Sequence, residues 1–139
     1  MGATSDIPTR FTFSKKERLH SKILIDALFR KGASFHLSPF IVKFLPNPDP
    51  KADGHQMMIT VPKKKFKRAV DRNKIKRLVR EAYRLSKPHI LNNKIDGGYL
   101  LIAYIYNSVE ILPYSFVEEK LKRTLERLIK SSVDKKTSL

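Results

Sequence analysis

The feature that most constrains the fold is a continuous apolar and aromatic run from Tyr99 to Tyr106 in a chain of 139 residues. Gly97-Gly98 precedes this run and Asn107-Ser108 follows it, so turn-forming residues mark both of its ends. A run of this length is typical of a central β-strand that is covered on both faces, and it is far too short to cross a bilayer. The chain is therefore expected to build a small sheet around this strand.

Turn and cap residues divide the chain before this run into short elements. Ser21 is placed to cap a helix, which Gly32 would end in a left-handed conformation. Pro39 interrupts a segment rich in Phe, Ile and Val, which predicts two strands or one bent strand. The elements expected here are a helix from 21 to 32, the strand segment 34–46, a turn region 47–54 and a strand 56–61.

Two further helices are expected on either side of the run. A basic helix is predicted from about Ala69 to Leu85, stopping before Pro88, because the residue before a proline avoids the helical region. The last helix is predicted to begin with a capping box made by Ser115 and Glu118. Its inward face is expected to carry Val117, Leu121, Leu125, Leu128 and Ile129.

Helix, strands, helix, strand and helix in this order predict an α+β fold, a two-layer α/β sandwich in which helices pack on a small sheet. The hydrophobic share of 41% is sufficient for one core, and the absence of cysteine excludes disulfides and thiol nucleophiles. We expect a single domain at residues 11–131, a flexible arm at 1–10 and a flexible tail at 132–139. The lack of cysteine also fits a reducing compartment, for which the cytoplasm is the simplest interpretation.

Positive charge is concentrated in one stretch of the sequence. The net charge is +16, and eleven of the 29 basic residues lie between Lys63 and Arg84, where only Asp71 and Glu81 offset them. A field of one sign over one patch attracts polyanions, and nucleic acid is the usual polyanion. The alternative is a merely solvated helix face, but such faces normally alternate acids with bases. Binding of a polyanion is therefore the preferred interpretation.

Helical spacing separates the basic stretch into two faces. One arc is apolar and is expected to pack on the sheet, whereas the rest is almost wholly cationic. Arg72, Lys76 and Arg80 form one row, so their charged groups can follow a phosphate backbone together. Arginine suits this task because its planar fork makes two parallel hydrogen bonds to phosphate. The apolar arc contains Ile75, Leu78, Val79, Ala82 and Leu85, and the row is flanked by Asn73, Arg77 and Arg84.

Other chemistries lack the side chains that they need. The four histidines have no metal-ligand spacing, and no glycine-rich phosphate loop occurs. Glu118 and Glu119 adjoin at a helix start, where carboxylates stabilise the helix dipole, and this explains them better than a metal-dependent nuclease site does. The sequence therefore predicts neither a catalytic nor a metal-binding residue. The histidines are His20, His36, His55 and His89.

The segment from Arg72 to Arg77, RNKIKR, and the LVREA that follows it resemble the signature of the protein subunit of bacterial ribonuclease P. Upstream, the residues from Val61 to Lys64 and Ala69-Val70 stand where that family has a strand end, a basic pair and the entry to its helix. Residues 28–32, LFRKG, are similar to the end of the family's first helix. The resemblance covers about residues 11–130, and Lys74 stands where the family usually has arginine.

This resemblance implies a fold and a division of labour. The fold is an αβββαβα sandwich like domain 2 of ribosomal protein S5, with an unusual left-handed βαβ crossover. The RNA subunit uses Mg2+ to remove the 5′ leader from precursor tRNA, and the protein assists as an accessory subunit without a catalytic side chain or a metal of its own. The implied partners are the RNA subunit and precursor tRNA, with no membrane and no obligate protein partner.

The resemblance also assigns roles to individual residues. The RNA subunit would be bound by Arg68, Arg72, Asn73, Lys74, Lys76, Arg77, Arg80 and Arg84, and the leader by Phe29, Phe40, Lys63 and Lys64. The leader would lie in a cleft between the first helix and the sheet, where unpaired bases stack on aromatic rings with little sequence demand. Ile25 stands at a second position that is often aromatic in the family. Phe40 and Phe44 are candidate substitutes, although aromatic residues at strand spacing more often pack in a core.

Two other classes of function are weighed against this one. A structural ribosomal protein or a general RNA-binding protein of similar fold would share the charge and the size, and the identity of the bound RNA would distinguish it. A self-sufficient nuclease is disfavoured, because the sequence has no carboxylate cluster for metal ions.

Overall fold

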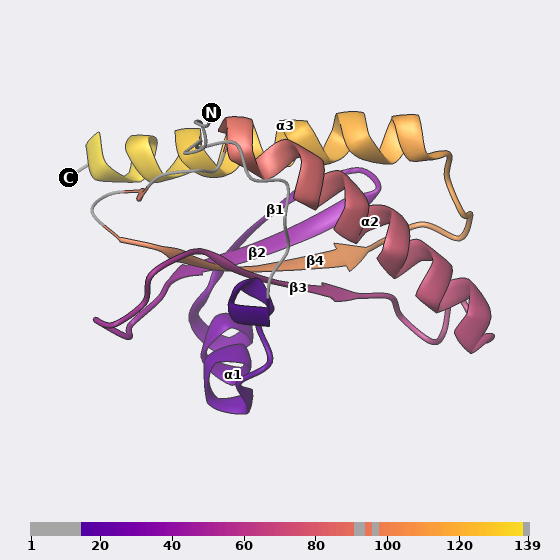
Figure 1. The fold of residues 1–139 in the computed structure, drawn as a ribbon, viewed down its shortest axis with the longest axis horizontal. Coiled ribbons are helices and arrows are strands. Elements are labelled where there is room, and N and C mark those ends of the chain that lie inside the picture. Colours follow the sequence, from indigo (N-terminus) through magenta and orange to yellow (C-terminus); the bar gives the residue numbers. More distant parts are fainter. Residues whose placement is uncertain (1–14, 91–93, 96–97, 138–139) are drawn as a thin grey trace, which may run out of the picture.

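Three α-helices and four strands make up the computed structural model over the residues that it describes, 15–90, 94–95 and 98–137 (Figure 1). A single 3-10 turn, η2 (Lys15–Glu17), comes first. The elements that follow are α1 (Lys22–Lys31), β1 (Ala33–Leu37), β2 (Phe40–Pro46), β3 (Gln56–Thr60), α2 (Ala69–Ile90), β4 (Leu100–Tyr106) and α3 (Tyr114–Thr137). The α+β class and the order αβββαβα are confirmed. The predicted arm at 1–10 lies outside the described residues.

The four strands form one sheet in the order β1-β2-β4-β3. β4 is an inner strand, as the apolar run predicted, and it is antiparallel to β2 and parallel to β3. The segment with Pro39 forms two antiparallel strands, β1 and β2, and the Ser38-Pro39 peptide bond between them is cis. Because β3 and β4 are parallel neighbours, α2 is the crossover that joins them; its expected left hand stays a prediction.

Successive residues of β4 contribute to two cores, because side chains alternate between the two faces of a strand. Ile102 and Tyr104 pack with residues of α2 and α3, whereas Leu101 and Ala103 pack with Leu28 of α1. Figure 1 shows α2 and α3 above the sheet and α1 below it. The sandwich therefore has an additional partial layer, since α1 lies on the face that α2 and α3 leave open.

α3 buries the face that its sequence predicts. Val117, Leu121, Leu125 and Leu128 are fully buried, and Ile129 packs at the margin of the same core. The hydroxyl groups of Tyr104 and Thr124 are 2.7 Å apart and join β4 to α3 inside the core. A buried hydroxyl that finds a partner avoids the cost of an unsatisfied polar group.

α2 buries an arc that is shifted from the predicted one, although Ile75, Val79 and Ala82 are buried as predicted. Tyr83 and Ser86 are buried, whereas Leu78 and Leu85 are only half-buried. The reason is that α2 packs against α3 as well as over the sheet. Helical spacing identifies an apolar arc, but it does not show from which side a second helix approaches.

Three helix boundaries differ from the expected ones. α2 does not stop before Pro88 but continues to Ile90; the ring of Pro88 is buried, so packing offsets the loss of one helical hydrogen bond. α3 begins at Tyr114, and the carbonyl oxygen of Pro113 accepts from the N–H groups of Phe116 and Val117, so Ser115 is not the cap. The predicted tail is helical as far as Thr137, because α3 continues into it.

At the two ends of α1, one prediction is confirmed and the other is corrected. Ser21 caps the helix by accepting a hydrogen bond from the N–H of Leu24 at 3.4 Å. Gly32 ends the helix, but with φ of −70° and ψ of 149° it is extended and not left-handed. Glycine is needed there for space, because a Cβ atom would lie 2.4 Å from the carbonyl oxygen of Leu28. None of the helices within the described ranges has the length and apolar character that crossing a membrane requires.

Candidate nucleic-acid interface

The basic side of α2 begins at the loop 61–68, which joins β3 to the helix. The N–H groups of Lys65 and Phe66 both donate to the carbonyl oxygen of Pro62 at 3.2 Å. Phe66 is buried, and its ring centroid lies 6.0 Å from that of Tyr106, so the loop is anchored in the core. The exposed side chains of this anchored loop are those of Lys63, Lys64, Lys65, Lys67 and Arg68.

Arg72 stabilises the same loop from the first turns of α2. Its Nη1 atom donates to the carbonyl oxygens of Phe66 at 2.8 Å and Lys67 at 2.9 Å. Charge-assisted hydrogen bonds to carbonyl groups contribute more than neutral ones, so Arg72 holds the helix and the loop in one geometry. The sequence placed Arg72 in the RNA-binding row, and the structure gives it an additional role as the residue that positions the loop.

The remaining residues assigned to RNA binding differ in exposure. Asn73, Lys74, Arg77 and Arg80 are exposed, and Lys76 is half-buried. The cations of this group form no ion pair with any acid in the described parts of the chain, whereas Arg68 lies 4.0 Å from Asp71. Buried side chains fix the other side of α2. Lys74, Lys76, Arg77 and Arg80 are therefore presented on a rigid support with their charge uncompensated.

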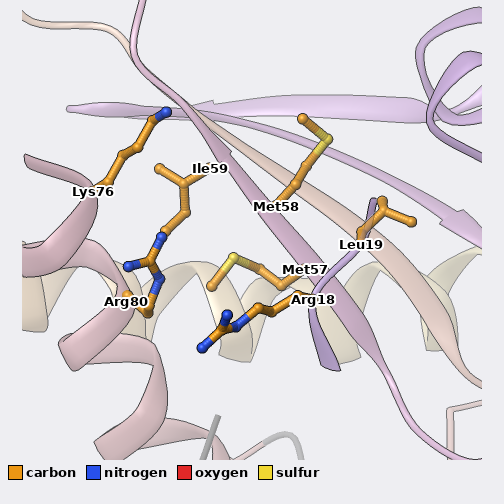
Figure 2. A pocket seen from close by; sticks show the side chains of 7 residues that line it. All are labelled: Arg18, Leu19, Met57, Met58, Ile59, Lys76 and Arg80. Atoms are coloured by element: carbon orange, nitrogen blue, oxygen red, sulfur yellow. The ribbon is translucent and has the colours of Figure 1, made fainter. Parts of the chain in front are cut away.

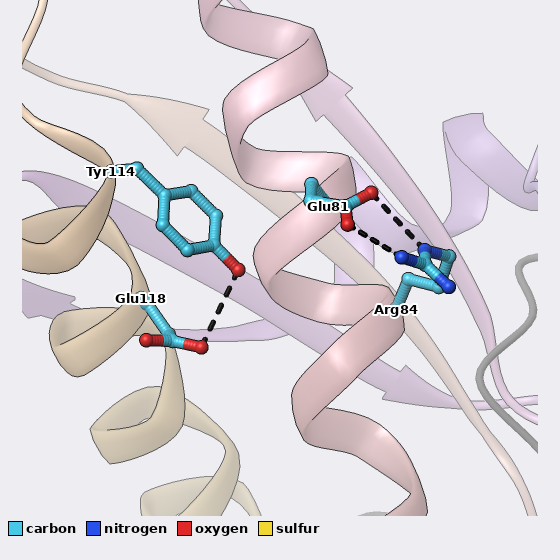
Figure 3. Close-up of polar contacts among 4 residues, drawn as sticks. All are labelled: Glu81, Arg84, Tyr114 and Glu118. Atoms are coloured by element: carbon cyan, nitrogen blue, oxygen red, sulfur yellow. Dashed lines mark hydrogen bonds and ion pairs between the residues drawn. The ribbon is translucent and has the colours of Figure 1, made fainter.

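Arg84 differs from these cations, because it forms an ion pair with an acid on the same helix (Figure 3). Its Nε atom lies 3.1 Å from Oε1 of Glu81 and its Nη2 atom lies 2.5 Å from Oε2. The hydrogen bonds from Arg84 hold the pKa of the Glu81 carboxyl below its ordinary value. Nearby, Tyr114 donates to Glu118 on α3 at 3.4 Å. The positive charge of Arg84 is largely offset, so it contributes less to an RNA-binding field than its place in the sequence indicates.

Phe29 is an aromatic residue that stays accessible on the side of the sheet that α1 covers. It lies near the end of α1 with 38% of its surface exposed. The Nζ atom of Lys43 on β2 is 5.8 Å from the centre of its ring, close enough for a cation–π contact. Lys43 was not predicted from the sequence. The alternation of side chains along β2 places it on the opposite face of the strand from Phe40 and Phe44, and this was the available signal. An exposed ring beside a cation can bind a base and its phosphate together.

Phe40 does not fit the leader-binding role that the resemblance assigned to it. It is 1% exposed, and its ring packs edge-on against those of Tyr104 and Tyr106. Phe44 is 9% exposed and packs in the same core. Strand alternation turns both rings toward α2 and α3, away from Phe29. Neither ring can stack on an unpaired base, so this prediction is corrected.

The other predicted leader-binding residues are not gathered into one contact. Lys63 and Lys64 lie in the loop before α2, and Phe29 lies at the end of α1. Ile25 is half-buried and packs against the smaller core below the sheet. Phe29 therefore lies beside Lys43, whereas Lys63 and Lys64 lie close to the start of α2.

Several of the described acids and one histidine are engaged in structural contacts. Nδ1 of the buried His55 accepts from the N–H of Leu100 at 2.9 Å. Glu17 pairs with Lys87, and Glu119 pairs with Arg123 at 3.1 Å. Over the described ranges, no group of three or more His, Cys, Asp or Glu side chains is placed to hold a metal ion.

Known proteins resemble this chain over most of its length. The family described as Ribonuclease P matches residues 13–129. The ribonuclease P protein component of Porphyromonas gingivalis is 38% identical over 123 residues, which cover 87% of this chain and 89% of that protein.

Solved structures give the same result. The ribonuclease P protein of Thermotoga maritima superposes with a TM-score of 0.62 at 30% identity, covering 80% of this chain and 96% of that one. The protein from Staphylococcus aureus superposes with a TM-score of 0.65 at 26% identity, covering 81% of this chain and 94% of that one.

Proposed function

The chain belongs to the ribonuclease P protein family, and from this premise we propose that it is the RNA-binding subunit of a ribonuclease P holoenzyme. In this role it binds the catalytic RNA subunit and the 5′ leader of precursor tRNA, and the RNA performs the endonucleolytic cleavage. The observation that carries the proposal is a set of cations on the outer side of α2 that pair with no acid among the described residues.

The RNA subunit is bound chiefly through phosphate contacts. Lys74, Arg77 and Arg80 project from a helix whose opposite face is buried, so little ordering of the protein is needed when RNA binds. If about five to eight phosphates are neutralised, the affinity falls by orders of magnitude over a modest rise in salt. Reading of base sequence is not required, because the arrangement of phosphates in a folded RNA is itself distinctive.

The leader of precursor tRNA is bound on the other side of the sheet. There Phe29 offers a ring on which an unpaired base can stack, and Lys43 lies beside it for the adjoining phosphate. Stacking accepts any base, which suits a subunit that meets many different leaders. Ile25 has no aromatic ring to offer the leader, so Lys43 supplies the second contact beside Phe29.

Magnesium is assigned to the RNA subunit and not to the polypeptide. Among the described residues no group of three or more acids or histidines is placed to hold an ion, and the carboxylates of Glu17, Asp26, Glu81 and Glu119 are each paired with a basic side chain. Mg2+ is usually held by one or two carboxylates together with phosphate oxygens and water. No step of the cleavage is therefore attributed to a side chain of this protein.

A reconstitution assay tests the proposal. The protein alone should leave precursor tRNA intact, whereas its addition to the RNA subunit should lower the magnesium concentration that cleavage requires. Cleavage by the protein alone would contradict the division of labour. RNAs recovered with the protein from cells give a second test, because enrichment of ribosomal RNA without the ribonuclease P RNA would support a ribosomal function instead.

The leader contact has its own test. Phe29→Ala should weaken the binding of precursor tRNA with a long leader by at least about fivefold, since base–aromatic stacking contributes about 1–3 kcal/mol per base. The same change should leave binding of precursor with a one-nucleotide leader unaltered. Equal effects on both substrates would place Phe29 outside the leader path.

A further inference from the structure

A pocket of about 220 Å³ opens at the outer edge of β3, between α2 and the segment that follows η2 (Figure 2). Its apolar wall is formed by Met57, Met58 and Ile59 of β3. Lys76 and Arg80 from α2 approach it on one side, and Arg18 approaches it on the other. The pocket therefore combines an apolar wall with a cationic rim.

The wall opposite α2 is held firmly in place. The N–H of Leu19 donates to the carbonyl oxygen of Met57 at 3.0 Å, which fastens this segment to the edge of the sheet. The ion pair between Glu17 and Lys87 ties the same segment to the far end of α2. A pocket with both sides fixed is largely formed before a ligand arrives, so binding costs little ordering of the protein.

The size of the pocket selects a small ligand. A cavity of about 150 Å³ accepts a benzene ring, and drug-sized ligands occupy about 300 Å³ or more. A volume of about 220 Å³ therefore suits one planar ring system. Thioether sulfur makes favourable contacts with aromatic rings, and flexible methionine side chains adapt to different rings. Met57 and Met58 border the pocket from the two faces of β3, so a ring at this edge can contact thioether groups on both sides.

The backbone of β3 adds polar groups at the same place. Met57 directs its carbonyl oxygen outward to Leu19, and strand alternation directs the N–H and C=O groups of Ile59 to the same outer side. The edge of a sheet offers such groups to a partner. The edge of a planar base can hydrogen-bond to them, whereas a purely aliphatic ligand cannot.

We infer that this pocket receives the base of one unpaired nucleotide of the RNA subunit, whose flanking phosphates bind Lys76 and Arg80. The inference rests on the proposed function and names the ligand of one part of that surface. It requires a nucleotide in particular, because the cationic rim selects phosphate and the apolar wall selects a ring. Phosphate contacts alone would leave the pocket without a role.

Methionine methyl groups give a direct readout. The chain has three methionines, and two of them, Met57 and Met58, line the pocket. With carbon-13 in the methionine methyl groups, adenosine and uridine monophosphate should shift the Met57 and Met58 signals at millimolar concentration. Ribose 5-phosphate and inorganic phosphate should not, because they lack the ring. Equal shifts with ribose 5-phosphate and with the nucleotides would overturn the inference.

A blocking substitution tests the same site in the complex with the RNA subunit. Ile59→Trp fills the pocket and keeps every cation, so it should weaken binding on the order of tenfold without changing the salt slope. It should also expose one unpaired base to chemical modification that the unaltered protein protects, while the backbone footprint persists. Ile111→Trp, on the exposed segment before α3, is the matched control and should change neither property.

Failure of the pocket to bind a base can be distinguished from failure of the protein to bind the RNA subunit. Met58→Trp blocks the pocket from another position, so it tests the inference if Ile59→Trp does not fold. If folded blocking variants bind and protect the RNA subunit as the unaltered protein does, the pocket receives no base and the proposed function stands. If the unaltered protein does not bind the RNA subunit at all, the proposed function itself fails.

Discussion

α2 and α3 are neighbouring helices with the same number of basic residues and different surfaces. Each carries seven Lys and Arg residues, but α2 has two acids and α3 has four. On α3, Glu119 pairs with Arg123 one turn away, so its charges alternate in sign. On α2, Lys74, Arg77 and Arg80 have no such partner in the described part of the chain. The number of basic residues therefore does not distinguish the two helices, whereas the number of acids beside them does.

The largest expected effect concerns charge removal from the two helices. Arg77→Ala with Arg80→Ala should weaken binding of the RNA subunit between about tenfold and a hundredfold and reduce the salt slope by about one to two units. Lys122→Ala with Lys130→Ala removes the same charge from exposed positions of α3 and should have little effect. Titrations at several salt concentrations measure both. Equal losses for the two pairs would mean that the protein attracts RNA through net charge alone.

The next effect concerns stability. Arg72→Ala removes the two hydrogen bonds that hold the loop before α2, so the free energy of unfolding should fall by about 1–2 kcal/mol. Arg123→Ala breaks an exposed pair on α3 and should cost at most about 0.5 kcal/mol. Urea denaturation compares them. Equal losses of unfolding free energy for the two variants would contradict the loop-positioning role of Arg72.

The smallest effect concerns the acid that α2 does retain. Glu81→Gln releases Arg84, so RNA binding should tighten slightly and the salt slope should steepen by less than about one unit. Since Arg84 lowers the folded-state pKa of Glu81, the pair stabilises the protein above the ordinary pKa of 4.5, and this stabilisation is lost as the pH falls through the lower folded value. The difference in stability between Glu81→Gln and the unaltered protein should therefore disappear at acidic pH. If the difference in stability persists at acidic pH, its cause is something other than the charge of the Glu81 carboxylate.

Local patterns predicted the elements of the fold better than their ends. The apolar run identified β4 as a central strand because burial on both faces leaves no polar position. Spacing also identified the inward face of α3. The end of α2 at Ile90 and the start of α3 at Tyr114 depend on packing between distant segments, which no local rule contains.

The candidate site was predictable to a similar degree. Charge density located the surface of α2, because only Asp71 and Glu81 offset the eleven basic residues of this stretch. The sequence did not show that Arg72 binds carbonyl groups or that Arg84 is paired with Glu81, since both depend on side-chain geometry. Phe40 was misassigned for a related reason: an aromatic residue on a strand faces the core or the ligand according to the register of the whole sheet.

Site-directed probing of the RNA subunit tests the central claim most directly. The chain contains no cysteine, so Lys74→Cys on α2 and Lys122→Cys on α3 each offer a single attachment point for an iron chelate that cleaves nearby RNA. The account predicts cleavage of the RNA subunit at defined positions from residue 74 and background cleavage from residue 122. Strong cleavage from α3 with none from α2 would contradict it, because the RNA would then lie against the wrong helix.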